Sequence, residues 1–129
     1  MTRRLEAGIE LTFGQSDFDR FARLSGDDNP IHVDKEFSAR TRFGRPVAHG
    51  LFLCSILRGL LDKLVPGGRI QEQSVMFPAP TYAGEHMRFT VTVTDAEGDG
   101  AESQLDFNLK VLRVSDTTIT CQGSGKVLI

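Results

Sequence analysis

The sequence contains no apolar run close to the ~20 residues that a helix needs to cross a bilayer. Its N-terminus carries an early acid, Glu6, and lacks an apolar core, so it does not resemble a secretory signal. Cysteine is scarce too. Cys54 and Cys121 lie far apart in apolar or strand-like surroundings, which favours buried free thiols in a reducing compartment over a disulfide. We therefore expect a cytoplasmic protein without a membrane partner.

The sequence also lacks a strong charge imbalance and the motifs of several enzyme classes. Its formal net charge is -2, and a slightly acidic field disfavours broad binding to nucleic acid. It has no Walker A motif, nucleophile elbow or Cys-x-x-Cys pair, and no dinucleotide-binding fingerprint in a suitable context. His32 and Asp34 could offer two ligands to a metal ion, but no convincing third is visible, so we expect no metal site.

The first half of the chain has helical signals. Ser16 can cap a short helix that ends near Gly26, and Asp34 can cap a second one that runs to Thr41. A third segment, residues 51–65, is apolar on almost every side, so it has to be covered on most sides. Its one polar stripe contains Ser55, Arg58 and Asp62. Arg58 and Asp62 are four residues apart, a spacing at which they could pair along the helix.

From Arg69 onward, apolar and polar residues alternate. The apolar positions are Met87, Phe89, Val91, Val93, Leu105, Phe107, Leu109, Val111, Ile119 and Cys121. Turn-forming residues at 97–100 and 115–116 separate the expected strands. One-sided alternation indicates an antiparallel sheet with one buried face. We predict a single α+β domain, residues 1–129, in which a curved sheet packs around the apolar helix.

The stretch Leu24–Asp34 is the strongest candidate for a site. Its turn-forming residues predict a loop between two short helices: Gly26, Asn29 and Pro30. Asp27 and His32 can meet across this turn, where a carboxylate and an imidazole that share one water would supply both acid and base. The alternative is a purely structural loop, with Asp28 as a turn former and Asp34 as a helix cap.

Gly50, directly before the apolar helix, could present its N–H to a carbonyl oxygen that becomes anionic, because it lies at the positive end of the helix dipole. Alternatively, Gly50 only permits close packing. We expect His49 to be a hydrogen-bonded core histidine. Arg40, Arg42 and Arg45 could contact phosphate groups of a carrier, although such clusters more often form a solvated surface.

Two stretches together resemble the hydratase motif of the MaoC-like family, which includes the (R)-specific enoyl-CoA hydratases: Ser25-Gly-Asp27-x-Asn29-Pro30-x-His32-x-Asp34 and Thr41-Arg-Phe-Gly-x-Pro46-Val-Ala-His49-Gly50. A later segment, Phe77–Glu85, is similar to the family's strand-turn segment, where an Asp is commoner than Glu85. The resemblance extends from about Leu11 to Ile129.

The resemblance implies a hot-dog fold, in which an antiparallel sheet wraps around a long central helix. It implies a homodimer or higher homo-oligomer with a ligand tunnel near the subunit boundary. The implied activity is that of a lyase that adds water to a 2-enoyl thioester, or removes it from a (3R)-hydroxyacyl thioester. The substrate would be carried on coenzyme A or an acyl carrier protein, and no further cofactor is implied.

By the same resemblance, Asp27 and His32 would form the catalytic pair. The Gly50 N–H would be the oxyanion donor, and Asn29 would position the site. Where some relatives carry a supporting serine, this sequence has Arg58. Arg58 could narrow or recharge the pocket near Ser55.

Two other functions are compatible with the resemblance. One is a non-catalytic hot-dog module that binds acyl thioesters, against which the presence of both Asp27 and His32 speaks. The other is a hot-dog thioesterase, an enzyme that tends to place its carboxylate on the central helix. The candidate carboxylate for that reaction, Asp62, lies well down the helix.

Overall fold

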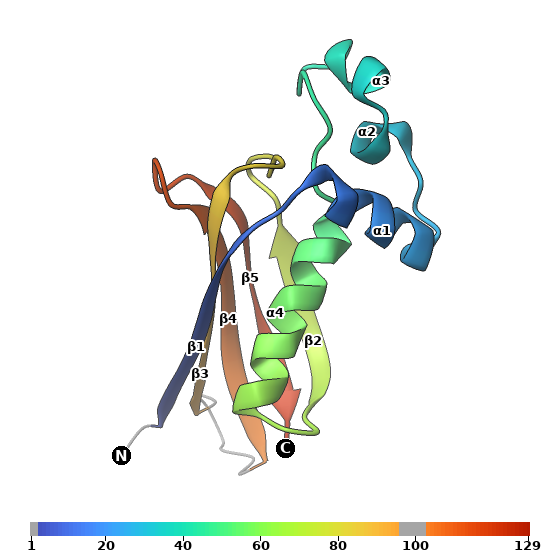
Figure 1. Ribbon diagram of the computed structural model, residues 1–129. Helices are drawn as coiled ribbons and strands as arrows, with labels where there is room; N and C mark the ends of the chain where they lie inside the picture. The colour runs from blue at the N-terminus through green and yellow to red at the C-terminus, as the bar shows by residue number, and fades with distance from the viewer. Residues whose placement is uncertain (1–2, 96–102) are drawn as a thin grey trace.

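The computed structural model describes residues 3–95 and 103–129, and its main element is a five-stranded antiparallel sheet. The strands are ordered β1-β3-β4-β5-β2 across the sheet, and the longest helix, α4, packs along its inner face (Figure 1). The elements are β1 (Arg4–Thr12), α1 (Gln15–Ser25), α2 (Pro30–Val33), α3 (Lys35–Ala39), α4 (Gly50–Leu64), β2 (Arg69–Met76), β3 (His86–Asp95), β4 (Gln104–Arg113) and β5 (Ile119–Leu128).

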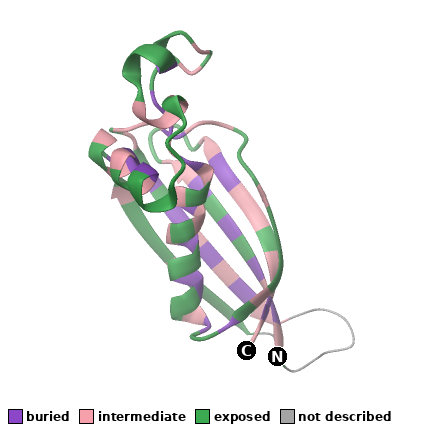
Figure 2. Ribbon diagram, turned by 90° about the vertical axis from the view of Figure 1, so that its right-hand side faces the viewer, coloured by how far each residue is buried: buried purple, intermediate pink, exposed green. Residues whose placement is uncertain are grey.

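The alternation predicted for β3 and β4 is confirmed. Their apolar side chains are buried between the sheet and α4, while most of the intervening residues are half-buried or exposed (Figure 2). The core is therefore a single layer between sheet and helix, the expected α+β arrangement. The predicted turn at 115–116 is present, whereas residues 97–100 lie outside the described residues. Cys54 and Cys121 are free thiols, as predicted.

Within the described residues, helix α4 is covered on one side only. Its buried residues are Leu53, Leu57, Leu60 and Leu61. The predicted polar stripe is exposed, and Leu51 beside it is 68% exposed. The predicted pairing of Arg58 with Asp62 is wrong, because both side chains bind the turn after the helix. Arg58 donates to the Gly68 carbonyl at 3.1 Å, and the Asp62 carboxylate accepts from the Gly67 N–H at 3.3 Å.

Two strand features depart from the sequence prediction. Strand β1 was not expected, and its apolar residues Leu5 and Ile9 are exposed at the sheet edge. In β5, Thr120 is fully buried although the alternation placed it outside. A register shift after Val111 in the pairing with β4 inserts one extra residue, a β-bulge, which turns Thr120 inward.

The three short helices lie at one end of the sheet, next to the N-terminus of α4 (Figure 1). Helix α1 begins after Gly14, whose N–H is bound by the Asp17 carboxylate at 2.9 Å, so the predicted cap at Ser16 is wrong. Its predicted end at Gly26 is confirmed by a left-handed φ of 80°. None of the described helices is long and apolar enough to cross a membrane.

Candidate active site

The loop between α1 and α3 contains a helical turn where we had expected an irregular loop. Helix α2 begins with Pro30, and Asn29 caps it by accepting from the Ile31 N–H at 3.1 Å. Asp34 caps α3 by accepting from the Phe37 N–H at 3.0 Å. These caps hold the turn, so that His32 projects from α2 toward the N-terminal end of α4.

The structure brings Asp27 and His32 together. Asp27 Oδ2 lies 3.8 Å from His32 Nε2. The other ring nitrogen, Nδ1, donates its hydrogen to the Val47 carbonyl at 2.9 Å. Because Nδ1 carries the hydrogen, Nε2 of the neutral ring has a free lone pair that faces the Asp27 carboxylate.

The gap between these two atoms suits one small molecule. At 3.8 Å the contact is too long for a direct hydrogen bond. One water placed about 2.8 Å from both atoms would donate a hydrogen to each. The Asp27 side chain is 48% exposed, whereas that of His32 is 14% exposed. The pair therefore has one side open to a ligand and one side enclosed by protein.

His49 contacts both members of this pair, and the prediction that it is a hydrogen-bonded core histidine is confirmed. It is 1% exposed, and its Nε2 donates to the Asp27 carbonyl at 2.9 Å. Its ring stacks on His32 with centroids 3.8 Å apart and planes at 22°. Burial lowers the pKa of His49 below its ordinary value, although the hydrogen bond to the Asp27 backbone opposes this effect.

These three residues do not form a convergent metal site. One potential ligand atom from each of Asp27, His32 and His49 lies within 4.8 Å of the others. However, the two imidazoles are stacked, so their in-plane lone pairs do not point at one position. In addition, His49 Nε2 already donates its hydrogen to a carbonyl. The donor set suits proton transfer better than metal binding.

A pocket of about 870 Å³ opens beside this cluster. It lies between the start of α4, the end of β2 and the segments 42–48 and 77–82, and Asp27 and Gly50 both line it. Arg42 also lines it, as the sequence suggested. Ser55 and Arg58 do not, because they lie on the exposed side of α4, where Ser55 donates to the Phe52 carbonyl at 2.7 Å.

Gly50 is the first residue of α4, and the ring of Phe77 covers it. A Cβ at position 50 would lie 2.7 Å from Cζ of Phe77. The requirement for glycine therefore has a packing cause, as one of our two interpretations proposed. Gly50 nevertheless lines the pocket, and its N–H makes no backbone hydrogen bond within the described residues. Both interpretations of Gly50 are compatible with this geometry.

The segment that carries Phe77 is anchored by Arg113, a residue that the sequence did not single out. The Arg113 guanidinium contacts Glu85 at 2.7 Å and Asp116 at 2.9 Å, and donates to the Pro80 carbonyl at 3.3 Å. Glu85 in turn accepts from the Tyr82 N–H at 2.8 Å. Glu85 thus fixes one wall of the pocket to the end of β4. No local sequence pattern marks its contacts to the pocket wall, because Glu85 and Pro80 are far from Arg113 in the chain and only Asp116 is close.

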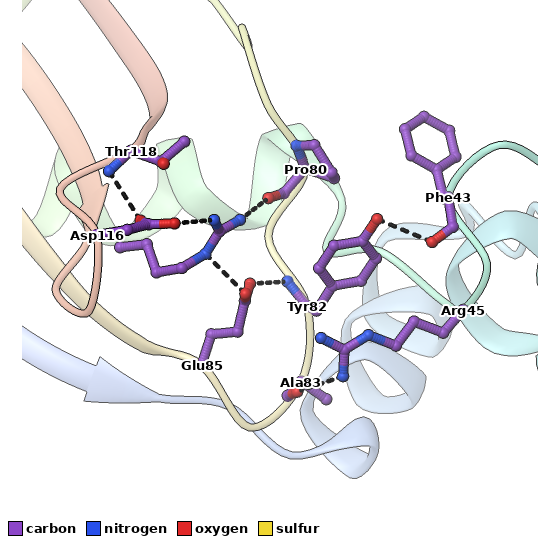
Figure 3. Close-up of polar contacts among 9 residues, drawn as sticks. Phe43, Arg45, Pro80, Tyr82, Ala83, Glu85, Asp116 and Thr118 are labelled. Carbon is purple, nitrogen blue, oxygen red and sulfur yellow. Dashed lines mark hydrogen bonds and ion pairs between the residues drawn. The ribbon is translucent and has the colours of Figure 1, made fainter.

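Tyr82 ties this wall to the segment that carries Arg42. Its hydroxyl donates to the Phe43 carbonyl at 2.8 Å (Figure 3). Arg45 lies over the Tyr82 ring, 4.3 Å from the centroid, and donates to the Ala83 carbonyl at 3.4 Å. The two segments at the pocket mouth therefore form one connected structure.

Comparison with known proteins agrees with this geometry. Residues 1–113 match the MaoC like domain. The (R)-specific enoyl-CoA hydratase of Aeromonas caviae is 40% identical over 96 residues, which cover 73% of this chain and 72% of that protein. The 3-hydroxybutyryl-CoA dehydratase of Methylorubrum extorquens is 38% identical over 97 residues, covering 70% of this chain and 62% of that protein.

The solved structure of the (R)-hydratase from A. caviae involved in PHA biosynthesis has the same fold. It superposes with a TM-score of 0.84 at 30% identity, covering 97% of this chain and 94% of that chain. The sheet wrapped along one helix thus defines a hot-dog protein, as predicted. The chain belongs to the MaoC-like domain family.

Proposed function

We propose that this protein is a hydro-lyase that adds water to a 2-enoyl thioester, or removes it from a (3R)-hydroxyacyl thioester. The observation that carries the proposal is the distance of 3.8 Å between Asp27 Oδ2 and His32 Nε2. This pair lies beside the pocket at the N-terminal end of α4. The names of the relatives, a hydratase and a dehydratase, support both directions of one reaction. The acyl group would be carried on coenzyme A or an acyl carrier protein.

In the proposed mechanism, Asp27 and His32 hold one water against the β-carbon of the enoyl group. His32 exchanges protons through Nε2, since its Nδ1 is bound to the Val47 carbonyl. The group that takes a proton from the attacking water returns a proton to the α-carbon, so hydroxyl and hydrogen are both added. The Gly50 N–H, at the start of α4, stabilises the negative charge on the thioester oxygen.

The test follows the loss of enoyl absorbance with crotonyl-CoA. Asp27→Asn and His32→Ala should each lower kcat at least ~100-fold, because each removes a group that transfers a proton. Asp28→Asn is the matched control, since Asp28 is a neighbouring exposed carboxylate that does not line the pocket. An inactive wild type with every enoyl thioester tried, or full activity in both variants, would overturn the proposal.

The same assay separates the two alternatives. A thioesterase would release free coenzyme A, and a binding module would bind the thioester without turnover. The thioesterase is disfavoured by Asp62, whose carboxylate binds the Gly67 N–H at the far end of α4 from Gly50.

We further propose that Arg42 binds a phosphate of the carrier. Its guanidinium lies over the Phe43 ring at 4.8 Å and has no hydrogen-bond or ion-pair partner within residues 3–95 and 103–129. Arg42→Ala should raise KM for crotonyl-CoA about tenfold, as expected for one lost charged hydrogen bond. It should leave KM for crotonyl-pantetheine, which has no phosphate, unchanged. Arg40→Ala is the control, and equal effects of Arg42→Ala on both substrates would contradict the assignment.

We propose a homodimer in the cytoplasm that needs no metal or added cofactor. Strand β2 is an exposed sheet edge, and the neighbouring Leu51 is an exposed apolar side chain on α4. A second copy that covers both would satisfy the unpaired strand and bury the apolar surface. Analytical ultracentrifugation should give twice the monomer mass. Activity should survive dialysis against a chelator.

A further inference from the structure

Among the residues that the structure describes, His49 is the one buried titratable side chain at the site that the proposed mechanism leaves without a task. It is fixed at the N-cap position of α4, directly before Gly50. From there it reaches Asp27 through a hydrogen bond and His32 through ring stacking. The edge of Phe21 packs against its ring, with centroids 4.9 Å apart, which holds the ring plane from a second direction.

The loop that carries Asp27 has few other anchors. The Asp27 N–H donates to Ser25 Oγ at 3.1 Å, and the Asn29 N–H donates to Asp27 Oδ1 at 3.4 Å. Both contacts join residues two positions apart, so they shape the loop without fixing its place relative to α4. The bond from His49 spans 22 positions and joins the Asp27 backbone to that helix.

We propose that His49 is a positioning residue that sets the separation of Asp27 and His32. Its Nε2–H holds the Asp27 backbone, and its ring face fixes the plane of the His32 ring. Both proton-transfer groups are thereby tied to the helix end that presents the Gly50 N–H. The inference rests on the proposed function, because positioning is measured through turnover.

His49 suits this task because it stays neutral. The titratable groups that interact with it are Asp27 and His32, and burial dominates the lowering of its pKa. Its Nδ1 is buried without a hydrogen-bond partner in the described part of the chain, which further disfavours a second proton. A charged ring stacked on His32 would oppose the positive charge that His32 acquires when it accepts a proton.

Two variants separate the two contacts. His49→Phe keeps an aromatic ring for stacking but removes the donor to Asp27. His49→Gln removes the stacked ring but places an amide N–H near the position of Nε2. Val93→Ala, in the core at the opposite end of β3, is the control for a general loss of stability.

We expect His49→Phe to lower kcat about 100-fold with KM changed less than about threefold, since small misplacement of a reacting group has effects of this size. His49→Gln should recover part of kcat because it restores a donor to Asp27, and its remaining loss reports the missing stacked ring. Val93→Ala should keep kcat while lowering Tm. The proposal is overturned if His49→Phe keeps wild-type kcat, or if His49→Gln and His49→Phe lose it equally. Loss of kcat in Val93→Ala would overturn it as well.

One measurement does not depend on turnover. The buried, hydrogen-bonded His49 Nε2–H should give a slowly exchanging imidazole signal in a ¹H–¹⁵N spectrum. It should disappear in His49→Gln and persist in Asp27→Asn, because the acceptor is the backbone carbonyl. If this signal is present but the wild type hydrates no thioester, the proposed function fails while the contact stands. If the wild type is active and the signal is missing, the inference about His49 fails alone.

Discussion

Replacing Gly50 by alanine tests the contact between helix α4 and the ring of Phe77. The new Cβ would lie 2.7 Å from Cζ, whereas ordinary contact begins at 3.4 Å, so restoring ordinary contact requires the ring to move by about 0.7 Å. Gly50 is not among the residues with positive φ, so alanine introduces no backbone strain. The perturbation is therefore a steric one, directed at a single side chain.

The stability cost of Gly50→Ala should be small. Overpacking of a rigid core costs about 1–3 kcal/mol, but Phe77 is 47% exposed and can shift toward solvent. Removing a glycine from a helix returns up to about 1 kcal/mol, and less at its first residue. We expect a net loss of about 1 kcal/mol and a fall in Tm of about 4 °C for a chain of this length.

The effect on turnover should be much larger than the effect on stability. The new methyl group beside the Gly50 N–H and the displaced Phe77 ring both crowd the proposed oxyanion position. We therefore expect kcat/KM for crotonyl-CoA to fall about 100-fold. The double variant Gly50→Ala/Phe77→Ala separates the causes, since it recovers activity only if the displaced ring is responsible.

The measurements are thermal unfolding and steady-state hydration of crotonyl-CoA by wild type, Gly50→Ala, Phe77→Ala and the double variant. Wild-type kcat/KM in Gly50→Ala would refute the assignment of Gly50 to the reacting region. A loss of Tm far greater than 4 °C would show that Phe77 cannot yield, against its exposure.

Three further predictions concern neighbouring groups. Burial lowers the pKa of His49 in the folded protein, so the unfolded chain binds the proton more readily. The free energy of unfolding should therefore fall as the pH drops below 6.5, the ordinary pKa of histidine. Denaturant titrations at several pH values measure this dependence, and His49→Gln should flatten it. The hydrogen bond with Cys121 lowers the pKa of the pocket-lining Cys54 thiol to about 7. Iodoacetamide at neutral pH should therefore modify Cys54 before Cys121, as measured by mass spectrometry. Bound substrate should slow the modification of Cys54. Arg113→Leu leaves the largely buried Glu85 without its cation, so the free energy of unfolding should fall by about 2 kcal/mol in chemical denaturation and KM should rise. Unchanged stability would show that the ion pair contributes nothing.

The regular elements in the middle and at the end of the chain could be predicted because their patterns are local. Strands β3 and β4 bury every second residue, and this period is visible in the sequence alone. Strand β1 carries the same alternation, but it lies at the sheet edge with Leu5 and Ile9 exposed. Its strand state depends on pairing with β3, about 80 residues away in register, and no local signal reports that partner.

Helix α4 shows the same division. Its apolar composition correctly predicted a helix from about residue 51 that packs on the sheet. Composition did not show which side faces the pocket. Ser55 and Arg58 were expected to reach the ligand, but the crossing of α4 over the sheet turns them to solvent and turns Leu53 and Cys54 inward.

The sequence by itself determined which residues we propose for proton transfer, because Asp27 and His32 lie in one short loop with a strong family resemblance. Only the tertiary structure decided how they are arranged. The free lone pair on His32 Nε2 depends on the carbonyl of Val47, 15 positions away, and the place of Asp27 depends on His49, 22 positions away. Hydrogen bonds between distant residues follow from the path of the chain through space, and that path is set by packing of the whole core.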